Sequence, residues 1–234
     1  MSKFYQATHI GNIRKHNEDS LAVIEPETYV VADGMGGHAA GEIASNMLVE
    51  NVKNILNSMP LPWNEYNLKE AISRSNEVIY EKSQNIAEYE GMGTTATILH
   101  IENQTAYYAH VGDSRIYRVK SDQLIQLTKD HSYVEELVRN GEISEVAARI
   151  HPMKNVLTQA VGAMPELNID AGNFKVEDGD ILLLCTDGLT NMVDDDTIKS
   201  IINRSANPAE DLISAALTGG GKDNISVIVV KYFS

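Results

Sequence analysis

Aspartate residues recur in turns that end apolar, strand-like runs along the whole chain. Five segments have this form: Asn17-Glu18-Asp19, Val31-Ala32-Asp33-Gly34, Val111-Gly112-Asp113, Cys185-Thr186-Asp187-Gly188 and Lys222-Asp223-Asn224. Any one of them is explained as an ordinary turn, because Asp and Gly are common turn residues. Five together indicate a cation site, because an unpaired buried carboxylate is costly and a bound ion supplies the missing positive charge. A folded chain builds such a site from carboxylates on distant segments.

The ligand types point to a particular metal and a particular chemistry. Oxygen ligands favour Mg²⁺ or Mn²⁺ over zinc, and a single histidine at the end of a motif, His38, does not make a zinc site. Two such ions, roughly 3.5–4 Å apart, lower the pKa of a shared water so that hydroxide forms near neutral pH. A phosphate monoester is the matching substrate, because its dianion is attracted to the metals and its leaving oxygen needs charge stabilisation.

Six motifs occur in a fixed order along most of the sequence. They are Arg14-x-x-Asn17-Glu18-Asp19, Val31-Ala32-Asp33-Gly34-Met35-Gly36-Gly37-His38, Gly93-Thr94-Thr95, Val111-Gly112-Asp113-Ser114-Arg115, Thr186-Asp187-Gly188-Leu189 and Gly221-Lys222-Asp223-Asn224. This series resembles the metal-dependent serine/threonine protein phosphatases of type 2C, in their compact bacterial form. The resemblance implies that metal-activated water hydrolyses phosphoserine and phosphothreonine directly. It implies phosphorylated proteins as substrates and a bacterial Ser/Thr kinase as the opposing enzyme.

The resemblance also implies a metal-binding role for particular residues. Asp33 would bridge two core ions, Mn²⁺ or Mg²⁺, and Gly34 would contribute its carbonyl oxygen to one of them. Asp187 and Asp223 would bind the other ion. Asp113 together with Asp187 resembles the third, weaker metal position of bacterial members.

Other residues of the motifs would support these ligands. The resemblance implies that Glu18 and Asp19 hold metal-bound waters. Arg14 opens the first of these motifs, and its guanidinium fits two phosphate oxygens; the alternative is a structural salt bridge to Glu18 or Asp19. Arg115 enters a strand and is interpreted as structural. Asn224 is expected to orient the preceding carboxylate through hydrogen bonds.

The proton donor to the leaving group stays open at this point. Eukaryotic members of the resembled family carry a histidine directly after the Asp-Gly pair, proposed as the general acid, whereas this sequence has Met35 there. Methionine cannot donate a proton, so either His38 or a metal-bound water would protonate the leaving oxygen. His38 could equally be a loop residue without a catalytic part.

Length and composition are those of one globular domain spanning residues 1–234, with 43% hydrophobic and 22% charged residues. The sequence contains no repeat, linker or low-complexity stretch. Its longest apolar runs, at 181–185 and 227–230, are too short to span a bilayer. The first residues do not begin a secretory signal. The expected protein is therefore a cytoplasmic monomer without membrane partners.

Charge and cysteine content exclude other classes. The formal net charge of −14 repels a phosphate backbone, and no basic cluster with interleaved aromatics offsets it, so nucleic acid is not an expected partner. The single cysteine, Cys185, lies in an apolar run and is interpreted as core. Thiol phosphatases need an arginine six residues after the cysteine, where this sequence has Asn191.

The first half of the chain predicts strands, a helix pair and a strand meander. Short β-rich runs at 4–10, 20–24 and 28–32 are followed by a helix at 40–56 and a second helix capped by Asn67-x-x-Glu70 and carrying Leu68 to Ile86. The meander covers 94–101, 105–111, 114–119 and 124–127, with turns at Glu102-Asn103 and Ser121-Asp122. Its short connections predict antiparallel neighbours throughout.

The second half predicts a helical excursion and a return to strands. Residues 130–162 begin with a helix at Ser132-x-x-Glu135, and by resemblance form a mobile flap beside the catalytic site. Strands are expected at 168–176, 180–186 and 225–232, and helices at 197–202 and 208–217, the latter capped by Asn207 with Pro208 in its first turn.

This order predicts an α+β fold with two antiparallel sheets packed face to face and helix pairs outside, the four-layer αββα sandwich of the resembled family, with a small helical flap. A dinucleotide-binding sheet is suggested by Gly34-x-Gly36-x-x-Ala39, but Asp33 would then face the pyrophosphate. Gly219-Gly220-Gly221-Lys222 is not a phosphate-binding loop, because Asp223 replaces the required Ser or Thr.

Two other functions compete with the protein phosphatase. A metal-dependent hydrolase of small phosphoesters would use the same metals, and the sequence does not specify the substrates. A metal-binding regulatory module without activity is the other possibility. Intact ligand positions argue against it, since inactive relatives usually lose ligands.

Overall fold

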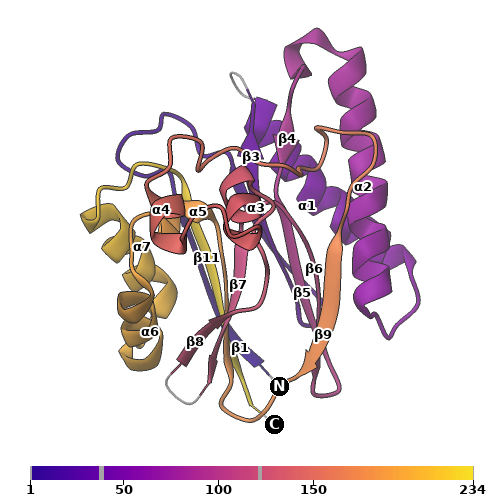
Figure 1. Ribbon diagram of the computed structural model, residues 1–234. Helices are drawn as coiled ribbons and strands as arrows, with labels where there is room; N and C mark the ends of the chain where they lie inside the picture. The colour runs from indigo at the N-terminus through magenta and orange to yellow at the C-terminus, as the bar shows by residue number, and fades with distance from the viewer. Residues whose placement is uncertain (1, 37–39, 121–122, 234) are drawn as a thin grey trace.

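The computed structural model describes residues 2–36, 40–120 and 123–233 (Figure 1). Two antiparallel sheets lie face to face, with α1 (Ala40–Ser58) and α2 (Glu65–Asn85) outside one sheet and α6 (Asp195–Arg204) and α7 (Pro208–Thr218) outside the other. The predicted four-layer αββα sandwich is confirmed.

The first sheet carries one of the two Asp-Gly motifs. Its strand order is β1 (Ser2–His9), β11 (Ile225–Tyr232), β10 (Ile181–Cys185), β7 (Arg115–Lys120) and β8 (Gln123–Gln126). The short helix α5 (Asp187–Thr190) follows β10 directly, where the sequence had indicated only a turn. Helix α7 packs on β1 and β11.

The second sheet carries the other Asp-Gly motif. Its strand order is β2 (Asp19–Ile24), β3 (Thr28–Met35), β5 (Ala96–Glu102), β6 (Thr105–Val111) and β9 (Asp170–Lys175), with β4 (Gly93–Thr94) paired to the end of β3. Helices α1 and α2 cover its outer face, and the 3₁₀ turn η1 (Ala87–Tyr89) follows α2.

Alternating side chains bind each sheet to both of its neighbouring layers. In β3, Val30 belongs to the apolar cluster under α1 and α2, whereas Val31 belongs to the cluster between the sheets. In β10, Leu183 belongs to the cluster under α6 and α7, and Leu184 meets the other sheet. Both central strands are therefore buried on both faces, which fixes their register, because a one-residue slip would exchange the two faces.

One helix start differs from the sequence prediction, and a second lies where it was predicted but lacks the side-chain cap. Helix α2 begins after Asn64, not Asn67: the Asn64 side chain accepts from the Asn67 backbone, and the Asn67 side chain accepts from the Asn64 backbone. An Asn at the third helical position thus takes the place of the usual Glu or Gln in a capping box. Asn207 occupies the N-cap of α7 as predicted, but its side chain makes no capping hydrogen bond, and Pro208 starts the helix.

The predicted meander was wrong at one connection. Hairpins β5–β6 and β7–β8 form, but β6 and β7 belong to different sheets. The chain crosses between sheets at Gly112, which has a φ of +106° and whose added Cβ would lie 2.5 Å from a Thr95 methyl carbon. Only glycine fits that turn. The predicted turn at Ser121-Asp122 lies outside the described residues.

Segment 130–162 lies over one end of the two sheets (Figure 1). It contains α3 (Tyr133–Arg139) and α4 (Glu145–Arg149), and the predicted cap is confirmed, because Ser132 accepts from the Glu135 backbone. Isolated antiparallel bridges join Ser132 to Leu157 and Thr94 to Val161. The segment is thus fastened next to β4 and the end of β3.

No helix in residues 2–36, 40–120 and 123–233 combines the length and the apolar character that a membrane crossing requires.

Gly188 sets the distance between two of the acidic turns. A Cβ added to it would lie 1.9 Å from the backbone oxygen of Asn224. The start of α5, with Asp187, is therefore in direct backbone contact with the segment that carries Asp223. No larger residue fits without moving one segment away from the other.

We predict that Gly188→Ala lowers the free energy of unfolding by about 1–3 kcal/mol, as overpacking usually does, and also weakens Mn²⁺ binding. Gly179→Ala is the control, since its added Cβ meets nothing within 4 Å and only its φ of +84° is unfavourable. Thermal unfolding and calorimetric Mn²⁺ titration measure both effects. Equal Mn²⁺ affinity in the two variants would show that the close approach at Gly188 does not shape the acidic cluster.

Candidate metal centre

The five aspartates meet at one end of the sandwich. Asp19 and Asp33 are directly opposite each other in the β2–β3 register. The Thr186 hydroxyl donates to Asp19 Oδ2 at 2.9 Å, so the residue before Asp187 is bound to Asp19 across 167 positions of sequence. The contact of Gly188 with Asn224 brings the Asp223 segment to the same place.

The aspartates also act on one another through their charges. Burial raises the pKa of Asp33 well above its ordinary value, and the negative charges of Asp19, Asp187, Asp113 and Asp223 raise it further, in that order. The structure thus gathers all five aspartates that the sequence singled out around Asp33.

The charged forms of Asp19 and Asp187 are also disfavoured. Burial raises the pKa of Asp19 to about 7, although hydrogen bonds from Ser226 and Thr186 oppose this. Burial and then the charge of Asp223 raise the pKa of Asp187 to about 6. Asp19 Oδ1 is buried and has no hydrogen-bond partner. Such a group lacks a positive neighbour, which an ion can supply.

These donors fit Mg²⁺ or Mn²⁺. All of the possible metal ligands are oxygens, and Asp19 Oδ1, which has no hydrogen-bond partner, is available as one of them. In the described part of the chain, no three His, Cys, Asp or Glu side chains form a ready-made ligand group. An ion here would therefore keep waters in its shell, as Mg²⁺ does when it is bound through one or two carboxylates.

Arg14 pairs with a different carboxylate from those predicted. Its Nη2 donates to Asp223 Oδ2 at 2.7 Å, so the alternative salt bridge to Glu18 or Asp19 was wrong. The Arg14 side chain is 49% exposed, which leaves much of the guanidinium open to an incoming anion. Arg115 instead binds Asp130 through both its Nε and Nη2 atoms, in keeping with its structural interpretation.

Glycines let the backbone of three segments meet at Gly34. The Gly34 amide donates to the Glu18 carbonyl at 3.0 Å, and a Cβ added to Gly34 would lie 2.1 Å from the Gly41 carbonyl oxygen. A Cβ added to Gly41 would lie 2.8 Å from Glu18 Oε2. Burial raises the pKa of Glu18, and Arg14 opposes that shift. The start of α1 therefore packs directly on the motif that carries Asp33.

The Asn224 side chain does not contact Asp223, contrary to the prediction. Its Nδ2 donates to the carbonyls of Ile10 and His16, both at 2.9 Å, and its Oδ1 accepts from the Glu18 amide at 2.8 Å. Only the Asn224 backbone amide reaches Asp223 Oδ1. The amide side chain instead fixes the loop that presents Arg14.

Several supporting residues were not recognised as such in the sequence. Thr95 Oγ1 accepts from the Asp33 amide at 2.8 Å, its own amide donates to the Asp33 carbonyl, and Thr94 Oγ1 donates to the same carbonyl. These three hydrogen bonds fix the position of the Asp33 backbone. Both threonines, like Thr186, lay inside the quoted motifs. Only the pairing of β3 with β4 gives them this role.

A cavity of about 610 Å³ opens beside the aspartates. Asp113 and Asp187 lie in its wall, together with residues of α3, α4 and β8. Asn191, one helical turn after Asp187, also lines it and donates from Nδ2 to Asp187 Oδ2 at 2.9 Å. The cavity can admit a substrate next to the carboxylates.

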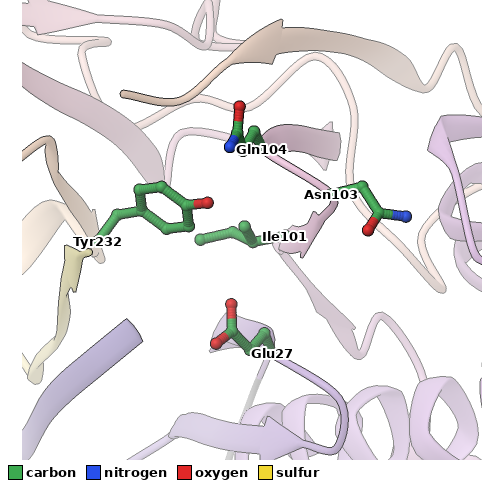
Figure 2. A pocket seen from close by; sticks show the side chains of 5 residues that line it. All are labelled: Glu27, Ile101, Asn103, Gln104 and Tyr232. Carbon is green, nitrogen blue, oxygen red and sulfur yellow. The ribbon is translucent and has the colours of Figure 1, made fainter. Parts of the chain in front are cut away.

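A second hollow, shown in Figure 2, is lined by Glu27, Ile101, Asn103, Gln104 and Tyr232. Glu27 precedes β3 and Tyr232 ends β11, so this hollow lies at the opposite ends of these strands from the acidic cluster. It takes no part in the candidate site.

Two further predictions concern acid catalysis and the thiol. His38, one of the two proton donors left open, lies outside the described residues. Met35 ends β3, where it pairs with Gly93. Cys185 is fully buried, and burial raises the pKa of its thiol to about 12, so it stays protonated and is no nucleophile at neutral pH. Its interpretation as a core residue is confirmed.

Comparison with known proteins agrees with the family resemblance seen in the sequence motifs. Residues 7–218 match the family model described as protein phosphatase 2C. Protein phosphatase PhpP of Streptococcus pneumoniae is 37% identical over 239 residues, covering 96% of this chain and 95% of that protein.

Solved structures superpose over the whole chain. Serine/threonine phosphatase Stp1 from Staphylococcus aureus has a TM-score of 0.94 at 32% identity, with 100% of this chain and 96% of that one covered. The catalytic domain of serine/threonine protein phosphatase PstP, solved in complex with two manganese ions, has a TM-score of 0.91 at 32% identity, with 100% and 99% covered.

The raised pKa values predict an unusual pH dependence of stability without metal. Asp19 has a pKa of about 7 in the folded protein against an ordinary value of 3.8, so the folded state binds more protons between these values. Stability of the metal-free protein should therefore fall as pH rises from about 4 to about 7. Added Mn²⁺ should restore it at pH 8.

Asp33→Asn should raise the melting temperature of the metal-free protein at pH 8 by several degrees, since about 1 kcal/mol corresponds to roughly 2–4 °C in a chain of this size. It should also flatten the pH dependence. Glu70→Gln, an exposed change on α2, removes the same charge and is the control. Calorimetry in chelator at pH 5 and pH 8 measures the melting temperature of each variant and its change with pH. Identical behaviour of the two variants would contradict the predicted repulsion around Asp33.

Proposed function

The chain belongs to the protein phosphatase 2C family and is a metal-dependent serine/threonine protein phosphatase, and we propose that its five converging aspartates bind the Mn²⁺ or Mg²⁺ ions. One observation carries this proposal: Asp33 stands opposite Asp19 in the β2–β3 register, and burial and the charges of four neighbouring aspartates raise its pKa. Carboxylates held together in this way are stabilised by a divalent cation.

We assign the core ligands as follows. Asp33 would be a ligand of both core ions, and the Gly34 carbonyl would be a ligand of one of them. Asp187 and Asp223 would hold the other ion. Asp113, in the cavity wall with Asp187, takes part in a weaker third position. Support for a separate third position is the cavity wall, which holds Asp113 and Asp187 but neither Asp33 nor Asp223.

Glu18 and Asp19 are assigned to waters of the metal shell. Support comes from the unpaired Asp19 Oδ1 and from Glu18 Oε2, which lies beside the first turn of α1. When bound, the ions supply a hydroxide nucleophile at neutral pH. The described residues of the cluster include no activated nucleophile, and the nearby Cys185 is buried and protonated. Hydrolysis is therefore assigned to direct attack by water, with no phosphoenzyme.

Arg14 is assigned to the phosphate of the substrate. Its guanidinium stands at the exposed rim of the cluster, paired with Asp223 on one side. Once a cation neutralises Asp223, the guanidinium fork is free to bind two phosphate oxygens. The Asn224 amide, by fixing the loop 10–18, keeps Arg14 at this rim.

Phosphorylated proteins are the substrates, and we propose a Ser/Thr kinase of matching specificity as the opposing enzyme. Phosphoserine and phosphothreonine are made with ATP, so enzyme and kinase must share a compartment, which we take to be the cytoplasm. We also propose that the protein is a monomer built as one phosphatase domain over residues 1–234, with 130–162 as a small flap. Turnover of phosphoproteins against nucleotide and sugar phosphates at equal Mn²⁺ tests the substrate class.

Metal-ligand variants test the assignments. Asp33→Ala and Asp187→Ala should lose nearly all activity, and excess chelator should abolish turnover of the wild type until Mn²⁺ is restored. Asp113→Ala should keep the two core ions and turn over more slowly. Calorimetric counting of bound Mn²⁺, together with turnover of an aryl phosphate, distinguishes these cases. Full activity in chelator, or unchanged turnover and metal count in Asp113→Ala, would contradict the assignments.

Arg14→Ala should raise KM for a phosphopeptide by roughly 10- to 150-fold, since a hydrogen-bonded contact to a charged group contributes about 1.5–3 kcal/mol. Its Mn²⁺ affinity should change much less. Arg14→Lys should recover only part of the loss, because an ammonium cannot reproduce the fork. Arg74→Ala, an exposed change on α2, is the control. If Arg14→Ala binds substrate and inorganic phosphate as well as the wild type, the phosphate role is wrong.

A further inference from the structure

A lysine of segment 130–162 reaches the metal centre through a single side chain. Lys154 Nζ donates to Asn191 Oδ1 at 3.1 Å, and Asn191 Nδ2 donates to Asp187 Oδ2 at 2.9 Å. Asn191 is also fixed by its backbone, which donates to the Asp187 carbonyl at 2.8 Å. The three side chains form one hydrogen-bonded line from the segment over the cavity to the carboxylate.

The chemistry of the three groups gives this line a direction. An amide can present either its oxygen or its NH₂ group, whereas an ammonium only donates and a carboxylate only accepts. Lys154 therefore holds the amide oxygen of Asn191 toward itself, and this leaves the NH₂ group facing Asp187. Without the ammonium, the Asn191 amide could turn over and place its oxygen against the carboxylate. The lysine also polarises the amide, which strengthens its donation.

The other cations of the cavity wall do not make this connection. Arg115 is bound by Asp130 and by the Tyr117 hydroxyl, and Arg149 lies 3.9 Å from Asp195. Lys129 lines the same cavity but has no hydrogen bond to Asn191 among the contacts of the described residues. Lys154 is thus the cavity cation with a path to Asp187.

We propose that Lys154 is a positioning residue of the phosphatase reaction. By setting the orientation of the Asn191 amide, it holds the Asp187 carboxylate in the orientation that metal binding requires. It thereby makes the affinity of the metal centre depend on where segment 130–162 lies. This inference rests on the proposed role of Asp187 as a metal ligand.

The test is a double-mutant cycle read by calorimetric Mn²⁺ titration and by kcat and KM for an aryl phosphate and a phosphopeptide. Asn191→Ala should weaken Mn²⁺ binding about tenfold, the lower end of the usual effect of a group that supports a ligand. Lys154→Ala should weaken it by a smaller factor. Lys154→Ala combined with Asn191→Ala should be no weaker than Asn191→Ala alone, because the lysine acts through the amide.

Three further comparisons sharpen the test. Lys154→Arg should recover most of the Mn²⁺ affinity, since arginine also only donates. Lys129→Ala is the matched control from the same cavity and should leave the affinity unchanged. In Lys154→Ala, kcat for the aryl phosphate should fall at limiting Mn²⁺ while its KM changes little. Melting temperatures of all variants, measured in chelator, show that the fold is intact.

Three results would overturn the inference. If the losses of Lys154→Ala and Asn191→Ala multiply in the double variant, the two residues act independently. If Lys154→Ala changes only KM for the phosphopeptide and leaves Mn²⁺ affinity intact, the lysine contacts substrate instead. If Asp187→Ala and Asn191→Ala both leave Mn²⁺ binding unchanged, the inference fails because the metal role of Asp187 has failed.

Discussion

Mutual repulsion among five buried or half-buried carboxylates is the constraint that the rest of this structure has to meet. Burial and then the neighbouring negative charges raise the pKa values of Asp19, Asp33 and Asp187, so the charged forms of these three carboxylates are disfavoured. The fold keeps them together by binding the backbone on either side of each one. Ladder pairing fixes Asp19 against Asp33, and the hydroxyls of Thr94 and Thr95 hold Asp33 in place.

Close backbone contacts do the same for one segment of each sheet. Gly34 and Gly188 each sit where an added Cβ would collide with a backbone oxygen, of Gly41 and Asn224 respectively. Side chains buried on both faces of β3 and β10 then fix which residues stand at the strand ends. The energy that holds the carboxylates together thus comes from apolar packing and backbone hydrogen bonds, and metal binding recovers the electrostatic cost.

Local sequence patterns were sufficient for much of this. Alternating apolar residues predicted the strands and the two-sheet class, and recurrent Asp turns predicted the residues that meet. The predictions that were wrong concerned contacts between residues that are far apart in the sequence. The sheet change at Gly112 looks like any short hairpin turn in sequence, and the partner of Arg14 is 209 positions away. Asn224 was expected to serve its neighbour Asp223, yet its side chain binds a loop from the N-terminal part of the chain. Such pairings follow only from the packed sheets.

The most direct test of the central claim is anomalous diffraction from crystals grown with Mn²⁺, recorded at the manganese absorption edge. A site built by these carboxylates should show two strong peaks between Asp33, Asp187 and Asp223, within coordination distance of their oxygens. A weaker peak beside Asp113 would mark the third position. Crystals saturated with Mn²⁺ that show no peak at Asp33, while the aspartates keep their present positions, would contradict the claim that this cluster exists to hold metal.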